Sequence, residues 1–222
     1  MAAVLAAWPA AALLTRPDRE DAEYRELASK YPSSIALAES GSEAVLIAPR
    51  WLLVPGSRAQ ALKSAGHAAI GGSRYDIERL YVHPSGALAL AFLRTPVADI
   101  EPSPVYRSRD EQGKAVAFVA HGRGAARAAI NTVDRVEANS LALRVKPLDE
   151  ASDLQGTLTP DELGAPLFIE VHEEPFVAGI ALDAGREWQT FARLSSYAGW
   201  IDDSIWKSGT DLDLPHGGKA KR

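Results

Sequence analysis

The chain has 222 residues, of which 46% are hydrophobic, and this is enough to bury one large core or two small ones. It contains no cysteine, which excludes disulfides, thiolate catalysis and cysteine-ligated zinc. Its formal net charge of -5 argues against a nucleic-acid partner, because binding phosphates requires a basic face.

Residues 1–17 are predicted to be a leader or signal segment. Residues 2–14 are apolar and rich in alanine, but this run is far too short to span a bilayer as a helix, so no stable membrane span is expected. Ala10 and Ala12 are placed for signal cleavage, although a basic segment before the apolar run is missing. A short apolar helix is the alternative. From this segment we expect an extracellular or periplasmic protein, and the Ala/Arg/Asp-rich composition suits a bacterial source.

A helix is predicted over residues 18–30, because proline and acids stand at its start and Pro32 ends it. From residue 34 the pattern changes to short β-type runs separated by turn residues. A first set of runs covers residues 35–38, 44–48, 51–54, 79–82 and 88–93, and a proline-rich connector follows at 96–104. A second set covers residues 115–120, 129–133, 141–145, 166–171, 177–182 and 190–194.

A last helix is predicted over residues 197–207, with Ser196 as its N-cap. Residues 208–222 are rich in Gly, Asp and Lys and are predicted to be a flexible tail. Two strand sets and a terminal helix favour two barrels in tandem. Strands and helices do not alternate as in βαβ units, which argues against a Rossmann or TIM architecture. The predicted units are residues 18–108, an N-terminal helix with the first barrel, and residues 109–207, the second barrel with the C-terminal helix.

Five separated stretches, in order, resemble the trypsin-like serine proteases. The first, residues 46–53 (LIAPRWLL), is similar to the strand that delivers the catalytic histidine. The others are 81–84 with 88–97 (like "VHP…DIALLKLKTPV"), 118–124 (like the "GWG" strand), 164–168 (like the end of "GDSGGPLF"), and 177–180 with 197–201 (like "VVGI" and the terminal "WI" helix). The resemblance covers about residues 31–206. It implies an all-β, chymotrypsin-like double six-stranded antiparallel β-barrel, with a C-terminal helix and a short N-terminal helix.

The residues that carry the family's chemistry are replaced. A serine protease needs a base within hydrogen-bond reach of its nucleophile and an acid that orients the base. The resemblance places Ser57 at the histidine position, Ala87 at the aspartate position and Leu163 at the serine position. Asp161 stands where the family has an oxyanion-hole glycine, and its carboxylate would oppose a developing oxyanion. All three catalytic roles are therefore empty, and no cofactor or metal is expected.

Glu162 matches the acid that pairs with a freed N-terminal amine in activated family members. No "IVGG"-like start precedes the barrel, so the resemblance implies that this activation switch is absent.

Two classes of function remain open. The first is a catalytically inactive homologue, a protein-binding or regulatory module that holds a protein or peptide partner at the inter-barrel cleft. The second is a serine endopeptidase with a non-standard or relocated active site. A decaying duplicate that merely folds is a third possibility. The histidines available to a relocated site are His67, His83, His121, His172 and His216.

We expect most of these histidines to be structural. His83 belongs to the family's ordinary His-Pro turn, His121 is expected to be a polar rim residue, and His172 is expected in a charged hairpin turn between Ile169 and Phe176. Neither H-E-x-x-H nor another metal-ligand spacing occurs in the sequence.

Overall fold

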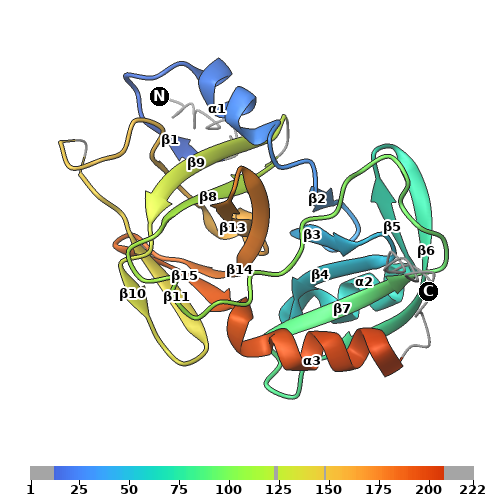
Figure 1. Ribbon diagram of the computed structural model, residues 1–222. Helices are drawn as coiled ribbons and strands as arrows, with labels where there is room; N and C mark the ends of the chain where they lie inside the picture. The colour runs from blue at the N-terminus through green and yellow to red at the C-terminus, as the bar shows by residue number, and fades with distance from the viewer. Residues whose placement is uncertain (1–12, 123–124, 148, 208–222) are drawn as a thin grey trace, which may run out of the picture.

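The computed structural model describes residues 13–122, 125–147 and 149–207. In this part of the chain, strands form two curled antiparallel sheets side by side, of six and seven strands (Figure 1). The predicted double-barrel, all-β architecture is confirmed. The second sheet has seven strands because a two-residue strand, β10 (Arg135–Val136), pairs with its neighbour at one edge.

The first sheet runs in the order β2-β3-β4-β7-β6-β5. Its strands are β2 (Ser34–Leu37), β3 (Ser42–Ala48), β4 (Trp51–Pro55), β5 (His67–Ile70), β6 (Ser73–Val82) and β7 (Leu88–Leu93). Every residue of β4 and β7 is buried. Because successive side chains point to opposite faces of a strand, both faces of these two strands must be covered, and this explains their unbroken apolar runs.

Two elements of this half were missing from the sequence-based assignment. A short helix, α2 (Ala59–Ala65), follows β4 after a 3-10 turn, η1 (Gly56–Arg58), and β5 comes directly after it. In addition, β6 begins at Ser73, six residues before the predicted start at residue 79. The first half of β6 is largely exposed, and its alternation rests on two partly buried residues, Tyr75 and Ile77, which is a weak signal for a strand.

The second sheet runs in the order β10-β11-β15-β14-β13-β8-β9. Its other strands are β8 (Ala115–Ala120), β9 (Arg127–Thr132), β11 (Ser140–Arg144), β13 (Pro166–Val171), β14 (Glu174–Ala184) and β15 (Trp188–Arg193). A separate two-stranded sheet joins β1 (Leu14–Thr15) to β12 (Gly156–Thr157). Residues 13–15 of the expected leader are therefore part of the fold, and Leu13 is only 1% exposed.

The β13–β14 hairpin confirms the charged turn expected around His172. Val171 pairs with Glu174, and the two residues between them, His172 and Glu173, have φ of 52° and 69°. A two-residue loop with both φ values positive matches the right-handed twist of the flanking strands.

The N-terminal helix, α1 (Asp21–Ala28), lies against β9 of the second sheet. Asp21 pairs with Arg127, and the Tyr24 hydroxyl donates a hydrogen bond to the carbonyl of Gln155 at 3.0 Å. Tyr24, Leu27 and Ala28 form its buried face. The helix that precedes the first sheet in sequence thus packs on the second sheet in space.

The C-terminal helix, α3 (Leu194–Lys207), runs along the first sheet (Figure 1). It begins three residues earlier than predicted, so the assignment of Ser196 as its N-cap was wrong. The Ser196 hydroxyl lies in the first turn and donates to the carbonyl of Ala138 at 2.5 Å. Among the described helices, none is both long enough and apolar enough to cross a membrane.

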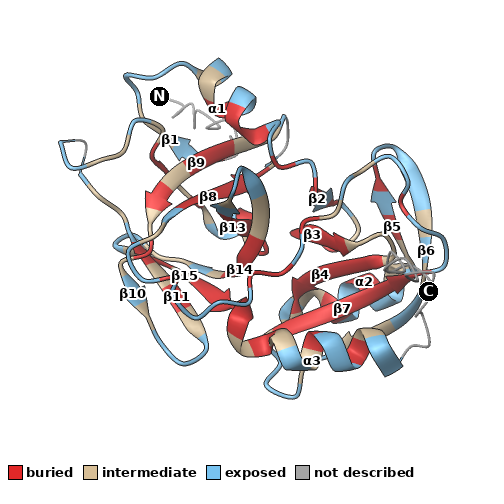
Figure 2. Cartoon of the chain, in the orientation of Figure 1, coloured by how far each residue is buried: buried red, intermediate tan, exposed pale blue. Residues whose placement is uncertain are grey.

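The largest apolar cluster contains residues of both sheets, and Figure 2 shows buried segments in each of them. Trp51, Leu53 and Phe92 of the first sheet meet Phe168 and Ile180 of the second sheet in this cluster. The alternate residues of the same strands, such as Leu52 and Leu93, belong to a second cluster inside the first barrel. Each central strand therefore contributes one face to its own barrel and the other to the junction.

Glu111 is buried in the segment that links the two barrels, with 0% of its surface exposed. Its carboxylate accepts two hydrogen bonds from Arg193, at 3.0 and 2.8 Å, and one from the Ser195 hydroxyl at 2.6 Å. Burial opposes ionisation of this carboxyl, but these hydrogen bonds outweigh it and hold the pKa of Glu111 below its ordinary value. The cluster joins the linker to the end of β15 and the start of α3.

We predict that Glu111→Gln lowers the free energy of unfolding by about 3–5 kcal/mol, because it leaves the Arg193 guanidinium buried without a counter-charge. Asp202→Asn is the matched control: Asp202 pairs with Arg107 on the surface, where both side chains are about half exposed. The control should cost less than about 1 kcal/mol. Urea denaturation measures both. Equal losses in the two variants would contradict a structural role for the buried cluster.

Candidate functional site

The positions matched to the family's histidine and aspartate lie on adjoining turns of the first barrel. Ser57 is exposed in η1, and Ala87 is half-buried at the end of the turn between β6 and β7. The Gly56 N–H donates to the carbonyl of Ala87 at 2.9 Å. A Cβ at Gly56 would lie 2.1 Å from the carbonyl oxygen of Gly86, so only glycine allows the two turns to approach this closely. The structure brings these two predicted positions together.

Leu163, at the serine position, lies where the second barrel meets β3. It follows a 3-10 turn, η2 (Pro160–Glu162), and precedes β13. Its carbonyl accepts hydrogen bonds from the Glu43 N–H at 3.2 Å and from the Ser42 hydroxyl at 2.9 Å. Gly164 has φ +95°, and a Cβ there would lie 2.3 Å from the carbonyl oxygen of Glu43. Main-chain atoms and a required glycine therefore hold this turn against the first sheet.

Asp161 and Glu162 share η2 but have opposite environments. Asp161 is exposed, whereas Glu162 is 1% exposed. The Glu162 carboxylate accepts hydrogen bonds from the N–H groups of Leu13, at 2.7 Å, and Thr159, at 2.6 Å. Burial raises the pKa of Glu162 above its ordinary value despite these hydrogen bonds, and the charge of Glu43 adds to the rise. The donor from Leu13 is a main-chain amide and not a free N-terminal amine. The expectation that this chain lacks an activation switch driven by such an amine stays a prediction.

His121 is a partly exposed polar residue at the end of a strand, as expected, and it also pairs with a buried carboxylate. It follows β8, and its Nδ1 lies 2.6 Å from Oε2 of Glu43, while its N–H donates to Oε1 of Glu43 at 2.8 Å. The Glu43 side chain is 5% exposed and that of His121 is 20% exposed. The pair crosses the junction between the barrels and orients the imidazole. When its Nδ1 carries the proton donated to Glu43, the ring is left with Nε2 as a basic nitrogen.

Sequence reasoning could not find this pair. Glu43 and His121 are 78 residues apart, and although His121 lies within the stretch 118–124, Glu43 lies outside all five matched stretches. They meet because the turn after β8 is folded onto β3, and no local pattern in the sequence encodes that contact.

The remaining histidines in the described part of the chain have structural surroundings. The His83 ring contacts Tyr197 and Trp200 edge-on, at centroid distances of 4.9 and 5.1 Å, and its Nδ1 lies 2.7 Å from the Ser85 hydroxyl. The expectation that His83 is structural fits this packing. His67 contacts the carbonyl of Ala65 at 2.8 Å. His216 lies outside the described residues. Across the described ranges, no group of three or more potential ligands could hold a metal ion.

Glu162 makes the stability of the fold depend on pH. A carboxyl with a raised pKa in the folded state is favoured there in its protonated form, so stability falls as pH rises from its unfolded pKa through its folded pKa. We predict that Glu162→Gln flattens this part of the profile, whereas Asp161→Asn leaves it unchanged. Urea unfolding at several pH values between about 4 and 8 measures the effect, and a profile unaffected by Glu162→Gln would contradict it.

The fold is similar to that of a solved trypsin-like peptidase. The chain matches a structure of kallikrein-related peptidase 10 in complex with Zn2+, with a TM-score of 0.59 and 16% identity. The match covers 80% of this chain and 97% of that chain. No protein-family model and no curated protein sequence matches the chain. The likeness establishes the chymotrypsin-type fold, and the activity must be argued from the residues that this chain carries.

Proposed function

We propose that the chain is a catalytically inactive trypsin-like serine protease homologue that acts as a protein-binding or regulatory module. The observation that carries this proposal is the set of side chains at the three catalytic positions of the fold. The side chains of Ala87 and Leu163 have no atom that can accept a proton or attack a carbonyl. Ser57 has a hydroxyl, but it stands at the position of the base.

The residue at the oxyanion position also supports the proposal that the chain is catalytically inactive. Hydrolysis of an amide requires donors aimed at the developing oxyanion. The exposed carboxylate of Asp161 lies two residues before Leu163, at the position of the donor glycine, and would place negative charge near that oxygen. Removing triad residues from a protease leaves a residual acceleration of about 10³–10⁴-fold over water, which depends on an intact oxyanion hole and on binding. We expect less from this chain.

We place the partner, an extended segment of a protein or a peptide, at the surface around Ser57, Ala87 and Leu163. Ser57 and Ala87 lie on turns of the first barrel and Leu163 on a turn of the second, and loops held by a rigid scaffold are common binding sites. We further propose a bacterial, extracellular or periplasmic protein with no nucleic-acid partner, in keeping with its composition and net charge.

A second candidate function is a serine endopeptidase with a relocated active site. The Glu43–His121 pair favours it, because a buried carboxylate that orients an imidazole through Nδ1 is the base half of a catalytic triad. This candidate requires a serine hydroxyl within hydrogen-bond reach of Nε2 of His121.

Fluorophosphonate labelling tests the catalytic part of the proposal, since the reagent reports an activated serine without the correct substrate. We predict no adduct on the purified protein while a trypsin control is fully labelled. His121→Ala is prepared in parallel. A stoichiometric adduct on one serine would overturn the proposal, and its loss in His121→Ala would establish the relocated site instead.

Selection from a displayed library of random peptides tests the binding part. We predict that peptides enriched on the native protein lose at least about tenfold in affinity for Ala87→Arg, a loss of about 1.4 kcal/mol, because the new side chain blocks the surface. Ala138→Arg, on an exposed alanine of the second barrel, is the matched control for an added arginine. Peptides that bind all three proteins equally would place the binding site elsewhere.

A further inference from the structure

The outer edge of β6 beside α2 carries main-chain groups that no strand engages in the described residues. β5 pairs only with residues 73–76, and β7 pairs along the other edge. The His83 N–H donates towards β7, to the carbonyl of Leu88 at 2.9 Å. Alternate residues of an antiparallel strand turn their N–H and C=O groups to opposite edges, so Leu80 and Val82 turn theirs away from β7.

The edge is open because the chain before β5 is helical. The Ile77 N–H donates to the carbonyl of Gly66 at 2.9 Å. Among the described residues, this is the last main-chain hydrogen bond along this edge of β6. Gly66 ends α2 in the left-handed conformation, with φ 70°, and the chain on its N-terminal side departs as a helix. Beyond Ile77, β6 is therefore flanked by α2 and not by another strand.

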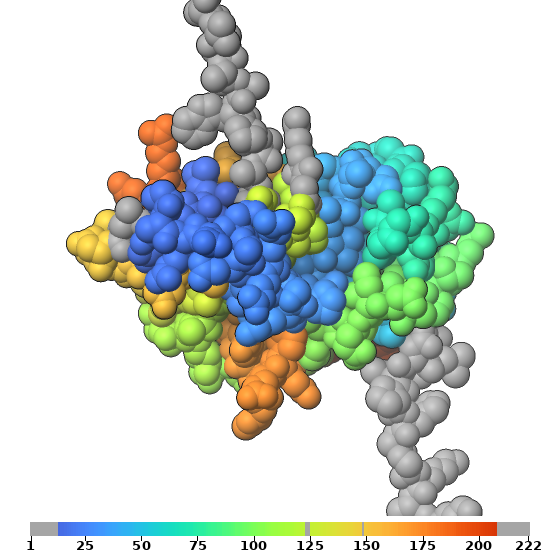
Figure 3. Space-filling model, turned by 90° about the horizontal axis from the view of Figure 1, so that it is seen from above, coloured from blue at the N-terminus to red at the C-terminus, as the bar shows by residue number. Residues whose placement is uncertain are grey.

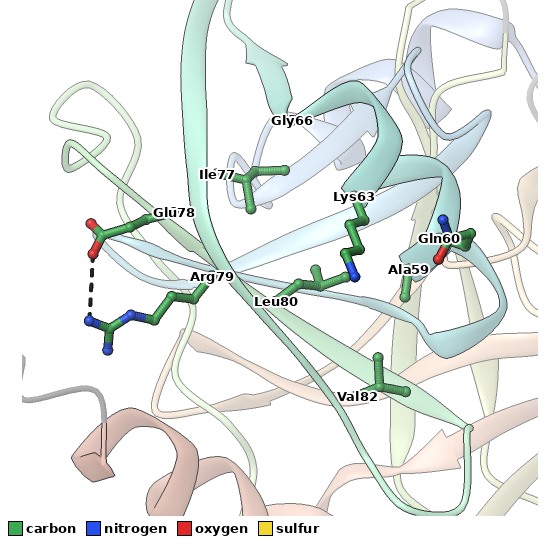
Figure 4. Close-up of a pocket in the computed structure, with 9 residues that line it drawn as sticks. All are labelled: Ala59, Gln60, Lys63, Gly66, Ile77, Glu78, Arg79, Leu80 and Val82. Carbon is green, nitrogen blue, oxygen red and sulfur yellow. Dashed lines mark ion pairs between the residues drawn. The ribbon is translucent and has the colours of Figure 1, made fainter.

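A groove of about 300 Å³ lies between α2 and this part of β6 (Figure 4). Ala59 and Lys63 line it from the helix, and Leu80 and Val82 line it from the strand. Val82 is 49% exposed, one of three large apolar side chains that the described surface leaves open. Lys63 extends from the helix towards Leu80, and it forms no ion pair with a described residue. Glu78 and Arg79 also line the groove and pair with each other at 3.7 Å, which leaves Lys63 as the cation above its apolar floor. This arrangement suits an extended segment in which acidic and apolar residues alternate.

We propose that residues 211–215 of this same chain (Asp-Leu-Asp-Leu-Pro) occupy the groove as an added strand of β6. These residues lie outside the described part of the chain, and their sequence alternates as a strand with one apolar face does. Leucines on the groove side would cover Leu80 and Val82, while the aspartates supply negative charge near Lys63. Pro215 has no N–H and ends the pairing.

The place where the described chain ends puts this segment within reach. The Trp200 ring of α3 lies 5.1 Å from His83, the residue after Val82. From Trp200 the helix continues to Lys207, about 10 Å further at 1.5 Å per residue. Residues 208–210 span up to about 10 Å when extended, enough to return from the helix end to the strand edge. A short tether also gives the segment an effective concentration on the order of millimolar, so that a weak strand addition is populated.

Covering this edge has a consequence for the state of the protein in solution. An open strand edge with an apolar side chain is a template for pairing with another chain. The added strand occupies those main-chain groups and leaves the edge closed, and a chain that loses the contact is expected to self-associate through β6.

Disulfide trapping tests the proposal directly, because the natural chain has no cysteine and any disulfide reports an introduced pair. In full-length protein, Val82→Cys is combined with Leu212→Cys or with Leu214→Cys. Leu14→Cys with Leu212→Cys is the control, since Leu14 is 55% exposed but lies on the two-stranded sheet beside the second barrel. We expect at least one Val82 pair to form an intrachain disulfide at least about tenfold faster than the control pair.

Two results would overturn the proposal. Trapping no faster than the control means that the segment does not occupy the groove, and disulfides found only between chains mean that a second copy occupies the edge. Hydrogen exchange of the unmodified protein gives an answer that is independent of any variant. The amides of Leu80 and Val82 should be protected, and in Asp211→Lys with Asp213→Lys they should exchange at least about tenfold faster. Exchange of these two amides at the rate of open loops in the natural chain would also refute the proposal.

Discussion

The apolar layer between the two sheets is the contact on which the rest of the structure depends. Trp51, Leu53 and Phe92 reach it from one side and Phe168 from the other, where the Tyr31 ring stacks on Phe168 at a centroid distance of 4.7 Å. Burial of each large apolar side chain contributes about 1.5–3 kcal/mol. The same strands fill the inside of the first barrel with their alternate residues, and neither barrel can shift against the other without exposing the layer between them. The turns that carry Ser57 and Leu163 are fixed relative to each other by this shared layer.

Polar groups at the junction follow from that arrangement. Glu43, Glu111 and Glu162 are all buried, and each is stabilised differently: by an imidazole, by a guanidinium, and by main-chain N–H groups. A buried carboxylate is tolerated only when such partners replace water. The pKa of Glu111 is lowered where a full counter-charge is present, and that of Glu162 is raised where the donors are amides. Each buried carboxylate at the junction is therefore stabilised by its own neighbouring groups.

The sequence predicted the limits of a strand correctly where both faces of the strand are buried. It failed to do so where one face is open to solvent. The limits of β7, β8 and β13 are those predicted, because their apolar runs end at turn residues. The first half of β6 and all of α2 were missed, since both are short or exposed and carry weak periodicity. The assignment of Ser57, Ala87 and Leu163 to the catalytic positions rests on motif order and stays a prediction. The Glu43–His121 contact could not be predicted, because it depends on how the two barrels are docked.

The three positions that the resemblance matches to the catalytic residues are held mainly through the main chain, although the Ala87 side chain also packs against the apolar cluster between the sheets. Leu163 is held through its carbonyl, which accepts from Glu43 and Ser42, and Ala87 is held through its carbonyl, which accepts from Gly56. Ser57 is exposed in its turn. The close approaches that shape the site need glycine at positions 56 and 164, where a Cβ would meet a main-chain oxygen at 2.1 and 2.3 Å. Since the backbone maintains these turns, side chains at the three positions can change without loss of the fold, and this is consistent with the binding surface that we propose there.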